Sequence, residues 1–292
     1  MGGQRSRAAV AALGATVITL AQARPAPIRL SWAKVSETGT RDSNQDCIGD
    51  ARHGERACFV VADGAGGHRG GETAAHRVVD AVLVAFCDKP GVGYVDLRDD
   101  LTAHLQACLD AAIAAVADAK RIAPALADMS ATVALLLIDP ATALAAWGHL
   151  GDSRIYLLRG GAVRMVSRDH SLAQQLIDAG LAGARGLREL PQRRVLLAAV
   201  GAENGIAPAI CDAEVILLPG DALLLCSDGL WEWIDEASML AAIPASAGSE
   251  DWLTAMCAMA ERASAAATPE RRAAGRDNFS AYAIHVHAAE AA

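Results

Sequence analysis

The chain has 292 residues, which is long enough to bury a substantial apolar core. Hydrophobic residues make up 53% of it and aromatic residues only 4%, so the core is expected to consist mainly of alanine, leucine and valine. A formal net charge of −8 argues against a surface that binds nucleic acids or anionic membranes.

Residues 1–27 form an alanine-rich leader that we predict to be disordered, ahead of a single domain at 28–288. The uncharged stretch Ala8–Ala21 is too short to span a bilayer, so no stable membrane span is predicted. Ala21-Gln22-Ala23 resembles the cleavage site of an export signal, and an upstream start codon is a further reading of the same segment. We predict a cytoplasmic protein, because seven cysteines without a CxxC pair are typical of free thiols in a reduced compartment.

Apolar runs and alternating patterns predict the β-strands. They cover Ile28–Val35, Ala57–Val61, Thr132–Ile138, Leu144–Leu150, Ile155–Leu158, Val163–Val166, Glu214–Leu218, Ala222–Cys226 and Phe279–Val286. The first is expected to be an edge strand. Turn residues at Asp139-Pro140, Arg159-Gly160-Gly161 and Pro219-Gly220-Asp221 predict that the strands on either side of each form hairpins.

Apolar residues at helical spacing predict four helices, and a mixed segment carries a shorter one. The helices cover Ala74–Phe86, Leu97–Ile113, Glu236–Ile243 and Asp251–Ala267, and the mixed segment is Leu172–Gly201. Consecutive hairpins interrupted by pairs of helices favour antiparallel sheets with helical layers over a doubly wound parallel sheet. The predicted fold class is therefore α+β.

Five aspartates stand at the ends of predicted strands or in loops: Asp46, Asp63, Asp152, Asp228 and Asp277. Two of them, in Asp63-Gly64 and Asp228-Gly229, directly follow buried strands. Carboxylates that converge from distant strand ends repel one another unless cations neutralise them. Ligation by oxygen alone suits Mg²⁺ or Mn²⁺ rather than zinc. The pattern favours a metal-dependent hydrolase.

The glycine-rich loop Asp63–Thr73 nearly matches a nucleotide-binding motif. Glu72 stands where a phosphate loop requires lysine, and Arg69 replaces the third glycine of a dinucleotide fingerprint. The glycines either let the backbone pass close to an ion, with the Gly64 carbonyl free to bind it, or form an ordinary strand-to-helix loop. A serine nucleophile has little support because the sequence contains no GxSxG elbow, and a cysteine nucleophile has little because it contains no HCx₅R arrangement.

Taken in order, the motifs resemble those of the PPM family of metal-dependent protein phosphatases, also called PP2C, in its bacterial branch. They are Arg41-x₄-Asp46, Asp63-Gly64-x-Gly66-Gly67-His68, Ser130-Ala131-Thr132, Gly151-Asp152-Ser153-Arg154, Ser167-Arg168-Asp169-His170-Ser171, Ser227-Asp228-Gly229 and Asp277-Asn278. The resemblance covers nearly the whole folded part. It implies a four-layer α-β-β-α sandwich of two antiparallel sheets flanked by helices, with two Mn²⁺ or Mg²⁺ ions at one end.

The resemblance also assigns roles to individual residues. The implied metal ligands are Asp46, Asp63, the Gly64 carbonyl, Asp152, Asp228 and Asp277. Asp63 would bridge the two ions, and Asp152 with Asp228 would offer a third, looser site that Glu232 assists. Arg41 would hold the substrate phosphate. Ala65 stands where many eukaryotic members have histidine, so His68 becomes the candidate general acid, while Gln45 replaces a glutamate found in those members.

The resemblance therefore implies hydrolysis of phosphoserine and phosphothreonine in proteins by a hydroxide that the two ions activate. The expected partners are phosphorylated substrates of a bacterial serine/threonine kinase, and the chain is expected to be a monomer. Two alternatives stay open: a catalytically weak regulator that binds phosphoproteins, and a Mg²⁺-dependent phosphatase of small phosphoesters. Arg185, Arg188, Arg193 and Arg194 are hypothesised to attract acidic or phosphorylated substrate segments, or else to form a solvated loop.

Overall fold

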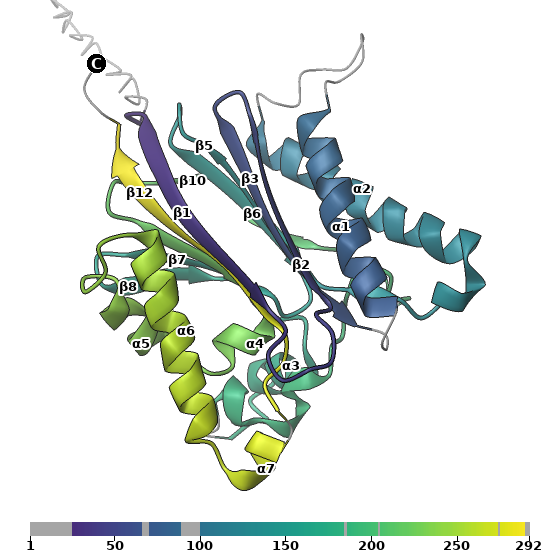
Figure 1. Ribbon diagram of the computed structural model, residues 1–292. Helices are drawn as coiled ribbons and strands as arrows, with labels where there is room; N and C mark the ends of the chain where they lie inside the picture. The colour runs from purple at the N-terminus through teal and green to yellow at the C-terminus, as the bar shows by residue number, and fades with distance from the viewer. Residues whose placement is uncertain are drawn as a thin grey trace, which may run out of the picture.

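Two antiparallel β-sheets lie face to face at the centre of the molecule, and helices cover both outer faces (Figure 1). The computed structural model describes residues 25–65, 70–88, 100–183, 186–203, 205–273 and 275–289. The predicted leader lies almost wholly outside this part of the chain. Within it, no helix combines the length and apolar character needed to cross a bilayer.

One sheet has five strands in the order β1 (Ile28–Glu37), β12 (Phe279–Ala288), β11 (Ala222–Cys226), β7 (Arg154–Arg159) and β8 (Ala162–Val166). The main path of the other runs β10 (Val215–Ile216), β6 (Leu144–Leu150), β5 (Val133–Asp139), β3 (Arg56–Ala65) and β2 (Asp46–His53). Two short strands, β4 (Ser130–Ala131) and β9 (Ala209–Ile210), pair with β3 and β6 and bring that sheet to seven strands. As predicted, β1 is an edge strand.

Helices α1 (Gly70–Cys87) and α2 (Leu101–Ile122) pack on the seven-stranded sheet. The five-stranded sheet is covered by α4 (Asp228–Trp231), α5 (Glu236–Ala242) and α6 (Ser249–Ala265). The segment between β8 and β9 contains α3 (Leu172–Asp178), η3 (Leu187–Glu189) and η4 (Pro191–Arg194). Short turns η2 (Pro124–Leu126) and α7 (Pro269–Ala273) complete the described helices. These layers confirm the predicted four-layer α-β-β-α sandwich.

The central strands are apolar on both faces because each lies between two cores. In β3, Cys58 and Val60 point into the core beneath α1 and α2, whereas Phe59 and Val61 point between the sheets. In β11, Leu223 belongs to the inter-sheet core and its neighbours on either side to the core under α6. Side chains alternate across a strand, so a strand buried on both faces reads as a continuous apolar run.

Two of the three predicted hairpins are confirmed and one is wrong. Strands β5 and β6 pair across the Asp139-Pro140 turn, and β7 and β8 pair across Arg159-Gly160-Gly161. The strands on either side of Pro219-Gly220-Asp221 do not pair with each other, because β10 pairs with β6 in the other sheet. Both edges of β11 are already occupied by β7 and β12, which leaves no place for β10 beside it.

The segment around Asp152 is a crossing between the two sheets. It connects β6 of the seven-stranded sheet to β7 of the five-stranded sheet. Gly151 has a φ of 112°, and a Cβ there would lie 2.6 Å from the Thr132 side chain. A glycine is therefore needed where the chain turns from one sheet into the other.

Candidate active site

The five predicted aspartates come from five separate segments and lie at one end of the sandwich. Figure 1 shows the β1–β2 loop, α4 and the start of β12 gathered there. Asp46 and Asp63 are cross-strand partners in β2 and β3. Burial raises the pKa of Asp63 well above its ordinary value, and the charges of Asp46, Asp228, Asp152 and Asp277 raise it further. The fold thus brings the other four carboxylates within electrostatic range of Asp63, and we call the five the acidic cluster.

Asp46 is held at the first position of β2 by a residue from the other sheet. The Ser227 hydroxyl donates a hydrogen bond of 2.8 Å to Asp46 Oδ2, and it accepts one from the Ser280 amide at 2.9 Å. Asp46 Oδ1 is buried and has no hydrogen-bond partner. Burial raises the pKa of Asp46 to about 6, against hydrogen bonds from Ser227 and Ser280 that lower it. One oxygen is fixed, and the other is left for a further ligand.

Asp228 is the first residue of α4, and Ser227, not Asp228, occupies the cap position. Asp228 Oδ1 is buried without a partner, like Asp46 Oδ1. Burial raises the pKa of Asp228 well above its ordinary value, and the charges of Asp152 and Glu232 raise it further. Its carboxylate is within electrostatic range of Asp46, Asp152 and Asp277, the other members of the acidic cluster that act on its pKa.

Gly229 explains how α4 approaches the segment before β12. A Cβ at this position would lie 2.0 Å from the Asn278 carbonyl oxygen, a distance that no side chain tolerates. Only glycine lets the two backbones touch. This contact sets Asp228 beside Asp277, although 49 positions separate them in the chain.

Asp152 is positioned through its backbone by a buried cation–aromatic stack. Trp231 Nε1 donates to the Asp152 carbonyl oxygen at 2.9 Å, and the Arg154 guanidinium lies 3.5 Å from the Trp231 ring centroid. Arg154 also makes two hydrogen bonds of 2.8 Å to Asp169. Burial raises the pKa of Asp152 to about 7; the charge of Asp169 raises it too, and that of Arg154 lowers it.

Gly64 lies where the end of β3 meets the start of α1. A Cβ on it would lie 2.3 Å from the Gly71 backbone, so the glycine is required by packing between strand and helix. The amide of Asp63 donates to Thr132 Oγ1 at 2.9 Å, which fixes the strand end from the other side. The packing agrees with the simple strand-to-helix reading, and carbonyl ligation by Gly64 stays a prediction.

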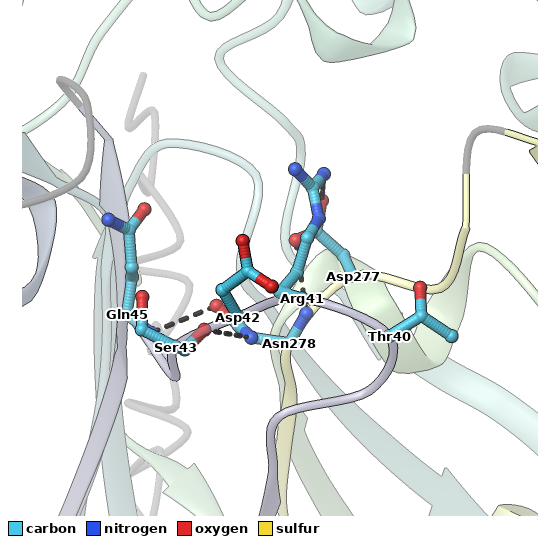
Figure 2. A pocket seen from close by; sticks show the side chains of 7 residues that line it. All are labelled: Thr40, Arg41, Asp42, Ser43, Gln45, Asp277 and Asn278. Atoms are coloured by element: carbon cyan, nitrogen blue, oxygen red, sulfur yellow. Dashed lines mark hydrogen bonds and ion pairs between the residues drawn. The ribbon is translucent and has the colours of Figure 1, made fainter.

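Arg41 lies in a pocket of about 330 Å³ that Asp277 of the acidic cluster also lines (Figure 2). The pocket is lined by Thr40, Arg41, Asp42, Ser43, Gln45, Asp277 and Asn278. Arg41 Nη2 contacts Asp277 Oδ2 at 2.7 Å. The predicted phosphate ligand thus neighbours a predicted metal ligand, and the side chain of Arg41 is 47% exposed. An exposed guanidinium can exchange this carboxylate for another anion at little cost.

Asn278 holds the loop that carries Arg41. Its Nδ2 donates to the carbonyl oxygen of Thr38 at 2.8 Å. It also donates to the Ser43 carbonyl oxygen at 2.8 Å, and its Oδ1 accepts from the Gln45 amide at 2.9 Å (Figure 2). Asn278 is buried, so all three bonds count toward stability. The sequence motif contained this residue, but nothing in it pointed to a role in fixing the loop.

Replacing Asn278 with alanine is expected to destabilise the fold by about 3 kcal/mol, at about 1 kcal/mol for each lost hydrogen bond. The loop with Arg41 should loosen as well and raise KM for phosphopeptides. Thermal unfolding and steady-state kinetics measure the two effects. Thr40→Ala in the same loop is the control, since Thr40 Oγ1 donates one hydrogen bond, to the Arg276 carbonyl oxygen at 3.0 Å. A lower melting temperature with unchanged KM would contradict the role in positioning Arg41.

The residues present fit a divalent cation that prefers oxygen ligands. Two buried carboxylate oxygens, Asp46 Oδ1 and Asp228 Oδ1, have no partner, and cross-strand carboxylates such as Asp46 and Asp63 repel each other. A divalent cation that prefers oxygen ligands would bind the unpartnered oxygens and neutralise the repulsion between the carboxylates. In the described part of the chain no three acidic, histidine or cysteine side chains are already arranged as a complete metal site. Binding would therefore require these side chains to rearrange.

Some of the predicted site residues lie outside the described part of the chain, and others make contacts that the sequence did not predict. His68, with the glycines before it, lies outside the described residues, as does Arg185. Two of the other arginines already pair with glutamates inside the protein: Arg188 bonds to Glu236, and Arg193 contacts Glu232 at 2.7 Å. Ser227 and Asp169 belonged to recognised motifs, but only contacts across the fold show that they position the acidic cluster.

The protein phosphatase 2C family model matches residues 35–270, and the chain belongs to this family. Among individual proteins, it is 32% identical over 216 residues to the serine/threonine protein phosphatase PstP of Mycobacterium tuberculosis. That match covers 73% of this chain but only 39% of the length of PstP. It is also 32% identical over 195 residues to protein phosphatase PhpP of Streptococcus pneumoniae, covering 66% of this chain and 76% of PhpP.

Solved structures agree with the fold. The crystal structure of M. tuberculosis PstP has a TM-score of 0.71 at 29% identity and covers 89% of this chain and 99% of that one. A structure of the PstP catalytic domain, with a TM-score of 0.69 at 28% identity over the same shares, is a complex with two manganese ions.

Proposed function

We propose that this chain is a serine/threonine protein phosphatase that uses two Mn²⁺ or Mg²⁺ ions. One observation carries the proposal: five segments far apart in the sequence place their aspartates in one cluster, with two buried carboxylate oxygens unpartnered. Such an arrangement costs stability unless cations offset it. The PstP structure with two manganese ions and the names of the relatives support the same activity.

Bound at the acidic cluster, two divalent ions would supply the positive charge that screens a phosphate dianion and lowers the pKa of an attacking water. The residues proposed to hold them are Asp46, Asp63, Asp228, Asp277 and the Gly64 carbonyl. Asp152, with Asp228, is proposed for a third, looser site. Glu232 is a weaker candidate there, because Arg193 already contacts its carboxylate.

Arg41 is proposed to bind the substrate phosphate in the pocket beside Asp277. Its guanidinium can donate two parallel hydrogen bonds to phosphate oxygens, which orients the phosphorus toward the acidic cluster. The present contact with Asp277 keeps the side chain at that position. His68 stays the prediction for the group that protonates the leaving serine or threonine oxygen.

Hydrolysis of a phosphothreonine peptide tests the proposal. Activity is expected with Mn²⁺ or Mg²⁺, to vanish on rigorous chelation with EDTA, and to return when Mn²⁺ is added in excess. Full activity after chelation would exclude the metal mechanism. Equal turnover of small phosphoesters and phosphopeptides would favour the small-molecule alternative, and peptide binding without turnover would favour a regulator.

The partners follow from the same proposal. Phosphoproteins of a bacterial serine/threonine kinase are the proposed substrates, and the chain is proposed to act as a cytoplasmic monomer. Free thiols such as Cys58, Cys108 and Cys226, all buried, are compatible with a reduced compartment.

A further inference from the structure

A group of arginines surrounds Glu232, one turn beyond the acidic cluster. Arg193 Nε lies 2.7 Å from Glu232 Oε1, and Arg194 Nη2 lies 3.6 Å from Glu232 Oε2. From α7, Arg271 Nη2 donates to the backbone oxygen of Glu232 at 2.9 Å. We call Arg193, Arg194 and Arg271 the arginine cluster. Two segments far apart in the chain thus direct three guanidinium groups toward one glutamate.

The charge of the arginine cluster is not balanced. Glu232 offsets one of its three positive charges. Burial lowers the pKa of Arg271; Glu232 opposes this, but the charges of Arg193, Arg194 and Arg188 lower the pKa further. Arg271 Nε is also buried without a hydrogen-bond partner. Three cations beside a single carboxylate leave room for another anion.

Arg188 shows the contrast within the same region. Its guanidinium makes two hydrogen bonds to the Glu236 carboxylate, at 2.9 and 3.0 Å, and two more to the backbone oxygens of Trp231 and Ile234. Its charge and donors are therefore committed inside the protein. The arginine cluster is less fully paired among the described residues. Besides the contacts with Glu232, Arg193 Nη1 donates one long bond of 3.4 Å to the Leu190 carbonyl oxygen, and Arg271 stacks on the Trp233 ring.

The arginine cluster lies beside the proposed reaction site. The Glu232 amide donates to the Asp228 carbonyl oxygen at 3.0 Å. The charge of Glu232 also raises the pKa of both Asp152 and Asp228. A substrate whose phosphorylated residue reaches the acidic cluster would therefore place neighbouring residues within reach of these arginines.

We propose that Arg193, Arg194 and Arg271 form a second anion subsite, which binds a carboxylate or a second phosphate a few residues from the phosphoserine or phosphothreonine being hydrolysed. The inference rests on the proposed function and specifies its substrate class: acidic or multiply phosphorylated segments. A planar guanidinium matches both anions through paired hydrogen bonds. Arg194, whose side chain is 37% exposed, is the member that substrate reaches most easily.

Three phosphothreonine peptides of equal length test the subsite, with neutral, glutamate or phosphoserine flanking residues. The anionic peptides are expected to have a kcat/KM about tenfold above that of the neutral peptide, because one charge-assisted hydrogen bond contributes about that factor in binding. Arg194→Gln and Arg271→Gln should each reduce this ratio toward one, mainly through KM, and Arg194→Lys should retain part of it. The two anionic peptides distinguish a preference for carboxylate from one for phosphate.

Arg188→Gln is the matched control. It removes an arginine of the same region that Glu236 already pairs, so it should lower the melting temperature and leave the peptide ratio unchanged. A ratio of one in the unaltered chain, or a ratio that neither subsite variant changes, overturns the subsite. If the unaltered chain hydrolyses no peptide, the proposed function fails instead. The subsite is then tested by fluorescence anisotropy with a labelled glutamate-rich peptide. The unaltered chain should bind this peptide, and Arg194→Gln should bind it more weakly; equal binding by both, or no binding, overturns the subsite.

Discussion

Replacing Asp63 with asparagine is expected to reduce phosphopeptide hydrolysis by at least about 10²–10³-fold, the loss typical of removing one charge that stabilises a transition state. Asp63 is the residue whose pKa the other four carboxylates all raise, so it lies at the centre of the acidic cluster. The amide keeps the shape and removes the charge. Steady-state kinetics with excess Mn²⁺ measure the effect.

The same variant should fold at least as well as the unaltered chain when EDTA is present. Asp63 stands directly opposite Asp46 across the β2–β3 pair, and like charges in that arrangement destabilise a sheet. Thermal unfolding in EDTA checks this. Asp110→Asn on the exposed face of α2 is the control and should change neither activity nor stability. Retained turnover in Asp63→Asn would remove this residue from the proposed metal centre.

Mn²⁺ is expected to stabilise the fold, and more strongly at pH 7.5 than at pH 5.5. A ligand present at a hundredfold excess over its Kd adds about 2.7 kcal/mol, which corresponds to about 5–10 °C in melting temperature for a domain of this size. Divalent ions bind the ionised carboxylates, so protonation competes with them. Thermal unfolding at both pH values, with Mn²⁺ and with EDTA, measures the difference.

The pH dependence without divalent ions follows from the raised pKa values. The pKa of Asp46 is raised from 3.8 to about 6 and that of Asp152 from 3.8 to about 7. A group that binds its proton more tightly in the folded state contributes stability below its unfolded pKa and loses it as pH rises through the folded one. Stability in EDTA should therefore fall between about pH 4 and pH 7. A stability that does not change with pH in EDTA, and that Mn²⁺ does not alter, would contradict the proposal that the acidic cluster binds cations.

The apolar runs and the aspartates that follow them predicted most of the architecture. Strands such as β3 and β11 were recognisable because burial on both faces makes them apolar throughout. The antiparallel layers followed from the order of hairpins and helix pairs. Asp63 and Asp228 were visible for a related reason: each follows a buried strand, and a carboxylate at a strand end can be presented to a ligand.

The partner of each polar side chain was not visible in the same way. Ser227 occupies the cap position of α4, but its hydroxyl makes no capping hydrogen bond and instead holds Asp46. Arg188 and Arg193 lie in a segment whose composition is that of a solvated loop. In the structure, however, they bond to Glu236 and Glu232 in the segment around α4 and α5. Strand β10 had the turn signal of a hairpin with β11 and joined the other sheet.

For this protein, the sequence by itself determined which residues can carry the chemistry and which strands are buried, because both are set by side-chain type and short-range periodicity. Only the tertiary structure decided which carboxylates face one another, which loop Asn278 holds and which arginines remain uncompensated. Those properties depend on contacts between segments tens to hundreds of residues apart. Such contacts arise from the packing of whole layers, and no local pattern encodes the partner of a single polar group.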